Sequence, residues 1–344
     1  MMIESTNETE IRAEPCPTCA VCGEGGDYIY LKQQDKMFGA PGEWNLKRCS
    51  NQKCQLIWLD PMPLEEDIGN AYACYYTHVS SGNPVRPGVL KREYLADIYN
   101  YPFDSGSSPI LGLRLLLRLF PFCRTGADGY VRFLSAVPHG CLLDVGCGSG
   151  DWLLSMRELG WEVTGVDFDK NAVRVGRERG LTIHSGALEQ LNFPNDSFDA
   201  ITLNHVIEHV PNPVETLREC LRILKPNGKL VVFTPNGSSL GHRIFKEYWR
   251  GLESPRHLHI FTHDSIYQAL RQAGYQNIAV LPWVAASSII YESYLLRRGW
   301  RGSFANAQLQ RPIWFFAQFF AMAELLLIKW KASVADCVVA IAVK

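Results

Sequence analysis

The stretch from Cys141 to Gly150, CLLDVGCGSG, constrains the fold of this chain more than any other. A short apolar run ends at Asp144 and Val145, glycines follow at alternate positions, and a helix-like segment begins at Asp151. Glycine adopts positive φ without strain and leaves the backbone open to a ligand. The pattern therefore predicts a buried strand, a turn on which an extended cofactor can lie, and a helix.

This turn differs from a dinucleotide-binding fingerprint, G-x-G-x-x-G, because Asp151 stands where the third glycine would be. Asp144, just before the turn, would repel a pyrophosphate and attract a sulfonium or an amino group. A second predicted strand, residues 162–166, ends at Asp167, which is placed to accept hydrogen bonds from two ribose hydroxyls. We therefore expect a cationic cofactor that carries a ribose.

Four blocks in this order resemble the class I S-adenosylmethionine-dependent methyltransferases: LDVGCGSG at 143–150, VTGVD at 163–167, FPNDSFD at 193–199 and LKPNGK at 224–229. The resemblance covers about residues 136 to 285. It implies a Rossmann-like α/β fold with a seven-stranded sheet, whose last strand is antiparallel and inserted beside the fifth. It also implies S-adenosylmethionine as cofactor. The residues expected at the cofactor are Asp144, Gly146, Gly148, Gly150, Asp167, Phe168, Leu188 and Asn204.

Strands and helices alternate through this region, as in a parallel sheet with helical crossovers. We expect strands near 140–145, 162–166, 181–184, 198–203, 229–234, 277–282 and 335–343, and helices near 151–159, 169–179, 213–224 and 264–273. The expected domains are a Cys-rich module at 1–80, a linker and helical segment at 81–135, and the methyltransferase domain at 136–344, with a helical insertion at 283–335.

The N-terminal module carries two cysteine pairs, Cys19–Cys22 and Cys49–Cys54. Four thiolates from two such pairs can surround a zinc ion tetrahedrally, and an all-cysteine set is typical of structural zinc. Cys16 with Cys19 forms an overlapping alternative pair, and Gly23 favours Cys22 over Cys16. This arrangement before a methyltransferase core resembles bacterial methyltransferases with a zinc module that are linked to sugar or cell-surface glycan pathways.

The amino-acid composition limits the classes of partner that we expect this protein to bind. The formal net charge is −1, from 34 basic and 35 acidic residues, so no overall field favours nucleic acid. The first residues are polar and acidic rather than a basic segment followed by an apolar one, so we expect a cytoplasmic protein. Two apolar segments, 110–120 and 313–328, either pack against the core or contact the inner face of the membrane; both are too short or too polar for a confident span.

Histidines supply the candidate catalytic groups. His205 follows the fourth predicted strand at the edge where open α/β sheets bind ligands, and His209 lies one helical turn later as a structural candidate. His257 and His259 alternate in an extended segment, which would aim both imidazoles at one place, with Arg256 beside them to hold a substrate phosphate or carboxylate. The alternative is that these two histidines have a structural rather than a catalytic role.

The favoured function is S-adenosylmethionine-dependent methylation of a sugar or cell-surface glycan intermediate. The second candidate is O-methylation of a quinol-like phenol, because the VTGVD block and Glu208-His209 also resemble the ubiquinone-biosynthesis O-methyltransferases. A third is a noncatalytic scaffold that binds a partner. The retained glycines and Asp167 argue against the third.

Overall fold

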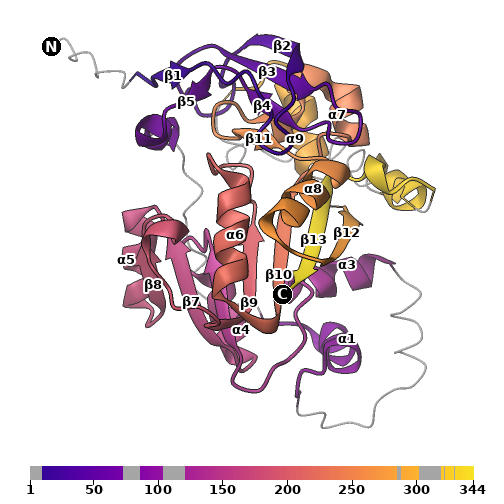
Figure 1. Cartoon of the computed structure of the whole chain (residues 1–344). Coiled ribbons are helices and arrows are strands. Elements are labelled where there is room, and N and C mark those ends of the chain that lie inside the picture. The colour runs from indigo at the N-terminus through magenta and orange to yellow at the C-terminus, as the bar shows by residue number, and fades with distance from the viewer. Residues whose placement is uncertain are drawn as a thin grey trace, which may run out of the picture.

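The computed structural model describes residues 10–72, 86–103, 121–284, 288–301, 319–320, 322–328 and 330–344. Its largest element is a seven-stranded sheet in the order β12-β13-β10-β9-β6-β7-β8 (Figure 1). The strands are β6 (Cys141–Val145), β7 (Glu162–Asp167), β8 (Thr182–Ser185), β9 (Phe198–Asn204), β10 (Leu224–Pro235), β12 (Asn277–Trp283) and β13 (Cys337–Val343). All seven predicted strands are present, and the α/β fold is confirmed; β10 begins at Leu224 rather than at 229.

The last strand lies where the sequence predicted it. β13 is antiparallel to both of its neighbours, β10 and β12, whereas β10, β9, β6, β7 and β8 run parallel to one another. Parallel neighbours need a crossover between them, and helices supply it. The carboxyl ends of β6, β7, β9, β10 and β12 therefore meet at one edge of the sheet.

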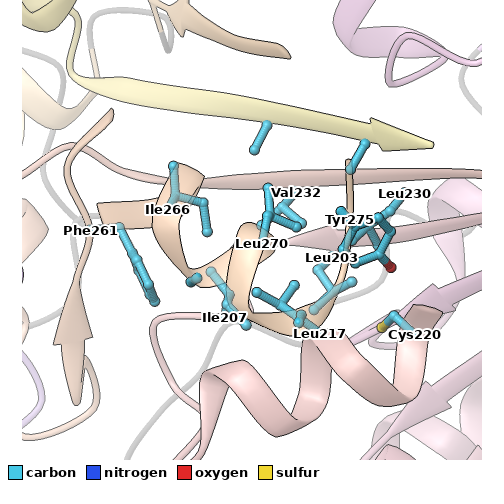
Figure 2. Packing of buried hydrophobic residues seen from close by; sticks show 14 of the residues in the cluster. Leu203, Ile207, Leu217, Cys220, Leu230, Val232, Phe261, Ile266, Leu270 and Tyr275 are labelled. Atoms are coloured by element: carbon cyan, nitrogen blue, oxygen red, sulfur yellow. The ribbon is translucent and has the colours of Figure 1, made fainter. Parts of the chain in front are cut away.

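Helices cover both faces of this sheet. They are α1 (Val89–Tyr99), α3 (Pro121–Tyr130), α4 (Asp151–Glu158), α5 (Lys170–Glu178), α6 (Pro213–Ile223) and α8 (His263–Ala273). Figure 2 shows how α6 and α8 bury Leu217, Ile266 and Leu270 against sheet residues such as Leu203 and Val232. On the opposite face, α1, α3 and α4 pack against alternate positions of the same strands. Strand alternation and helical periodicity together divide the core into these two layers.

The N-terminal module forms a second sheet, of order β11-β4-β3-β2. Its strands are β2 (Gly26–Gln33), β3 (Trp44–Cys49), β4 (Ile57–Leu59) and β11 (His259–Ile260), while β1 (Ala13–Glu14) pairs with β5 (Met62–Pro63). β11 comes from the methyltransferase half of the chain and pairs with β4. The module is therefore joined to the larger domain by backbone hydrogen bonds; its predicted boundary at residue 80 lies outside the described residues.

Short helices connect these parts. They are η1 (Glu65–Tyr72), η2 (Leu188–Gln190), α7 (Leu240–Phe245), η3 (Lys246–Tyr248), η4 (Arg250–Leu252), α9 (Ser288–Arg297) and η6 (Ala332–Val334). Between β12 and β13 the chain is also helical at 319–320 and 322–327. Among the described residues, no helix has the length and apolarity needed to cross a membrane. The apolar segment at 110–120 lies outside them.

Candidate active site

The glycine turn adopts the conformation that the sequence predicted. Gly146, Gly148 and Gly150 have φ values of 72°, 55° and 78°, in the left-handed region that side chains disfavour. A Cβ built on Gly146 would lie 2.3 Å from Cγ2 of Val206, so this position needs glycine for space as well as for conformation. At these three glycines no side chain covers the backbone of the turn, which lies at the carboxyl edge of the sheet.

Asp167, at the end of β7, is held at the wall of a cavity beside this turn. Its Oδ2 accepts from the backbone N–H of Gly148 at 2.7 Å and its Oδ1 from that of Asp169 at 2.9 Å. The cavity has a volume of about 490 Å³, within the range of about 300–1,000 Å³ usual for small-molecule sites. It is lined by Glu65, Ile68, Gly69, Tyr72, Val145, Gly146, Val166, Asp167, Phe168, Gly186, Ala187, Leu188, Glu189, His205, Val206, His209, Val210, Pro211 and Thr216.

Half of the predicted cofactor residues line this cavity. Gly146, Asp167, Phe168 and Leu188 do, and the ring of Phe168 is 55% exposed, as a stacking surface for a nucleobase must be. The other four, Asp144, Gly148, Gly150 and Asn204, lie outside the lining. Gly148 acts through the hydrogen bond that orients Asp167.

Asp144 is placed differently from the prediction. Its side chain is buried, and its Oδ1 accepts hydrogen bonds from the guanidinium of Arg132 and, at 2.7 Å, from the hydroxyl of Thr202. Burial raises the pKa of Asp144, and the charge of Arg132 opposes that rise. A buried carboxylate needs such partners. Asp144 is therefore held by Arg132 and Thr202, and it lies outside the cavity lining.

His205 is the imidazole that the structure brings to the cavity with a carboxylate behind it. Its side chain is 42% exposed, and its Nδ1 lies 3.1 Å from Oε1 of Glu208. The other carboxylate oxygen accepts from Thr234 at 3.0 Å. Burial alone would raise the pKa of Glu208, but the hydrogen bond and charge of His205 outweigh it and lower that pKa to about 2. With Nδ1 turned to Glu208, Nε2 is the nitrogen of His205 left for a ligand.

His209 contributes a second imidazole to the lining, and it is held from two sides. Its Nδ1 lies 2.9 Å from the phenol oxygen of Tyr72 and 3.0 Å from the carbonyl oxygen of Arg256. The ring of Tyr72 also meets that of Phe168 edge-on, with centroids 5.2 Å apart. Because Tyr72 ends η1, the N-terminal module forms one wall of the cavity.

His257 and His259 do not line the cavity. The backbone turns at residues 254–256, and only residues 259 and 260 belong to a strand, so the two imidazoles do not share the extended face that alternation predicted. His257 is buried, donates from Nδ1 to the carbonyl of Gly251 at 2.8 Å, and packs edge-on against His209. Burial lowers the pKa of each to about 4. Both imidazoles are buried within the protein, and neither contributes to the lining of the cavity.

Arg256 also differs from its predicted role at a substrate anion. It is completely buried, and its guanidinium donates to Asp35 at 2.8 Å, to Glu253 at 2.9 Å and to the carbonyl of Ala71 at 3.0 Å. Through these hydrogen bonds Arg256 connects Ala71, the residue before Tyr72, to the loop that contains His257. Arg256 therefore aligns the two walls of the cavity.

The four predicted zinc ligands come together. One ligand atom from each of Cys19, Cys22, Cys49 and Cys54 lies within 4.8 Å of the others, and Cys16 is outside this group. The sulfur pairs Cys19–Cys54 and Cys22–Cys49 are 3.6 and 3.3 Å apart. Four thiols this close fit a tetrahedral divalent ion. The cluster packs on α8, where Thr262 donates to the carbonyl of Cys54 at 2.8 Å.

The sequence reasoning did not assign Glu208 to the site, nor Glu65, Ile68 and Gly69 of η1. The spacing of His205 and Glu208 by three residues was an available signal, because side chains at i and i+3 of a helical turn are neighbours. No local pattern marks η1, since only the tertiary fold brings it to the sheet.

Comparison with known proteins agrees with this geometry. A family model described as a methyltransferase domain matches residues 113–280. A demethylmenaquinone methyltransferase from Anoxybacillus flavithermus is 31% identical over 171 residues, which cover 41% of this chain and 72% of that protein. A demethylmenaquinone methyltransferase from Listeria monocytogenes serotype 4a is 38% identical over 122 residues, 32% of this chain and 51% of that protein. The chain thus spans about half the length of that relative.

Among solved structures, phosphoethanolamine N-methyltransferase 2 from Haemonchus contortus is similar with a TM-score of 0.45 and 18% identity, over 88% of this chain and 70% of that one.

Proposed function

Because the chain belongs to the class I S-adenosylmethionine-dependent methyltransferases, we propose that it methylates an acceptor held between η1 and the loop after β9, with His205 as the base. The observation that carries this proposal is the pairing of His205, at the cavity, with the buried carboxylate of Glu208 at 3.1 Å. A fixed carboxylate orients the imidazole toward the cavity, which a general base needs.

The residues of the cavity fit the cofactor. Gly146 leaves its backbone bare, Asp167 presents a carboxylate fixed by two N–H groups to the ribose hydroxyls, and Phe168 presents an exposed ring to the adenine. When bound, S-adenosylmethionine supplies a methyl group on a sulfonium, which accepts the electron pair of the acceptor as the bond to sulfur breaks. His205 takes the proton that the acceptor loses. Tyr72 and His209 hold the acceptor in line.

For the acceptor we favour a quinol-like phenol over a sugar. The two relatives described above, of whose length the match covers 51% and 72%, are both named for a quinone substrate, demethylmenaquinone. The wall opposite the glycine turn is also rich in apolar side chains, such as Ile68, Val210 and Pro211. An aromatic ring buries well on such a wall, and its hydroxyl is acidic enough for an imidazole to assist ionisation.

A sugar or glycan intermediate is the second candidate, supported by the polar groups on the same wall. Glu65, Tyr72 and His209 all line the cavity, and a polyhydroxylated acceptor would use such donors and acceptors. The zinc-module arrangement of the N-terminal region favours this candidate too.

Mass spectrometry after incubation with S-adenosylmethionine tests the proposal. Reduced demethylmenaquinone analogues, simple phenols and nucleotide sugars are offered separately to the wild-type protein and to His205→Gln. We expect a 14-dalton gain in the quinol-like acceptor with the wild type and little with the variant. Cofactor binding without methylation of any acceptor would favour the scaffold instead.

We also propose that Cys19, Cys22, Cys49 and Cys54 hold one structural zinc ion. Their sulfurs come from two separate turns, around Cys19 and around Cys49, and all four point to one place. An all-cysteine set without an open position suits a structural rather than a catalytic ion.

A further inference from the structure

The helical residues 319–320 and 322–327 carry apolar side chains that are exposed. Phe319, Met322, Leu326, Leu327 and Trp330 are 73, 44, 57, 43 and 91% exposed, and we call these residues the apolar stripe. Positions 319, 322 and 326 recur at intervals of three or four, so they share one face of a helix, and Trp330 follows in the turn after it. The opposite face is the one that faces the protein: Leu325 and Ile328 pack beside Val284.

A helix in contact with water alone would present polar side chains on its outer face. Here that face is the apolar one, while the acidic Glu324 is buried on the inner side. Large contiguous apolar surfaces on proteins mark contacts with other molecules or with lipid. The stripe therefore needs an apolar partner.

The charges around the stripe identify the partner. Arg297 ends α9, Arg298 and Arg301 follow it, and Lys331 follows the stripe. All four are exposed, and within the described part of the chain no ion pair of theirs is seen. Phe320 joins the helix to the cluster that contains Tyr294 of α9, so the two basic groups belong to one region. A basic, apolar helix surface is complementary to an anionic bilayer, in which tryptophans such as Trp300 and Trp330 occupy the interface.

The stripe lies toward the same edge of the sheet as the cavity. Val284, on which Leu325 and Ile328 of the inner face pack, directly follows the end of β12. Asp336, just before β13, accepts a backbone hydrogen bond from Asn236, the residue after β10. Figure 1 shows this helix, in yellow, at the outside of the molecule. A protein resting on this side would bring the carboxyl edge of its sheet toward the bilayer.

We infer that the apolar stripe and its flanking basic residues dock this protein on the surface of a membrane containing anionic lipid. The stripe enters the interface, and the arginines and Lys331 contact the lipid phosphates. This inference stands apart from the choice of acceptor, although a lipophilic acceptor would be presented at the same surface.

Co-sedimentation with vesicles tests the inference. The whole protein is mixed with vesicles of phosphatidylcholine, with and without phosphatidylglycerol, and compared with Leu326→Ser. Leu31→Ser is the matched control, because Leu31 is 60% exposed on the N-terminal module. We expect binding to the anionic vesicles that weakens with salt, falls by about tenfold or more in Leu326→Ser, and persists in Leu31→Ser.

Two outcomes would overturn it. One is absence of binding to anionic vesicles, or equal binding by wild type and Leu326→Ser. The other is a dimer in analytical ultracentrifugation that Leu326→Ser dissociates, since the stripe would then be covered by a second copy. Calorimetry of S-adenosylmethionine binding, unchanged in both variants, separates this result from failure of the proposed function.

Discussion

The phenol oxygen of Tyr72 lies 2.9 Å from Nδ1 of His209, although 137 positions separate the two residues in the chain. Tyr72 belongs to the N-terminal module and His209 to the loop after β9. Arg256 completes this junction, because its guanidinium bonds to Ala71 and its carbonyl oxygen to His209. The module therefore shapes the acceptor side of the cavity, whereas the glycine turn and Asp167 shape the cofactor side.

Asp167→Ala is expected to weaken S-adenosylmethionine binding by about 1–3 kcal/mol, because ribose hydroxyls would lose their acceptor. Isothermal calorimetry measures the effect. Asp196→Ala is the control, since Asp196 is an exposed partner of Lys344 far from the cavity lining. Equal affinities for wild type and Asp167→Ala would remove Asp167 from the site.

His205→Gln should lower kcat by about 10²-fold or more, with S-adenosylmethionine affinity and melting temperature preserved, because glutamine keeps hydrogen bonding and removes the base. Glu208→Gln should lower kcat in the same direction, since the imidazole loses the carboxylate that orients it. His184→Gln serves as the control: its ring packs on Phe193 and is absent from the lining. A His205→Gln enzyme of full activity would refute the role of base.

Tyr72→Phe should raise KM for the acceptor more than it changes the affinity for S-adenosylmethionine. The variant removes only the hydroxyl that meets His209, a hydrogen bond worth about 0.5–1.5 kcal/mol. Steady-state kinetics and calorimetry on one preparation give the two numbers. Tyr267→Phe, at a half-exposed tyrosine of α8, is expected to change neither. If the cofactor affinity fell as much as the acceptor affinity, Tyr72 would be a general packing residue.

Zinc is expected at one ion per chain, and its removal should loosen the module and raise KM for the acceptor before it affects cofactor binding. Elemental analysis of protein purified without chelator measures the ion. Cys22→Ser should lose it and Cys16→Ser should keep it, because only Cys22 lies in the four-sulfur group. Metal-free wild-type protein with normal activity would contradict the proposal.

Stability should fall as the pH drops from about 6.5 to 4.5. Burial lowers the pKa of His242, His257 and His259 to about 4, from an ordinary value of 6.5. The unfolded chain therefore binds more protons than the native state in this window, so the free energy of unfolding rises with pH and is fully present above about 6.5. Urea unfolding measures the free energy of unfolding at pH 7 and at pH 5. The difference between the two values should be about 1–2 kcal/mol smaller in His259→Gln than in wild type.

His263→Gln is the control for this measurement, since the side chain of His263 is 36% exposed. The carboxylates of Glu208 and Glu253, whose pKa values are lowered, add a separate loss only below about pH 4.5. A pH dependence identical in wild type and His259→Gln would show that this imidazole does not titrate on unfolding.

The sequence determined the parts of this protein that depend on short stretches of chain. The turn from Gly146 to Gly150, the position of Asp167 after its strand and the pairing of Cys19 with Cys22 follow from local rules of backbone conformation and ligand spacing. The alternation of strand-like and helix-like stretches likewise predicted the seven strands, because each pattern is set within a few residues. The place of the last strand beside the fifth followed from the family resemblance.

Only the tertiary structure decided which distant residues these local elements contact. The sequence predicted Asp144 at the cofactor, whereas in the fold it is buried beside Arg132. It predicted His257 and His259 at the acceptor site, whereas both are buried outside the cavity lining. The contact of Tyr72 with His209 likewise joins two segments that are far apart in the chain. Burial and long-range hydrogen bonding arise from segments far apart in the chain, so their partners are fixed by packing, which no short pattern encodes.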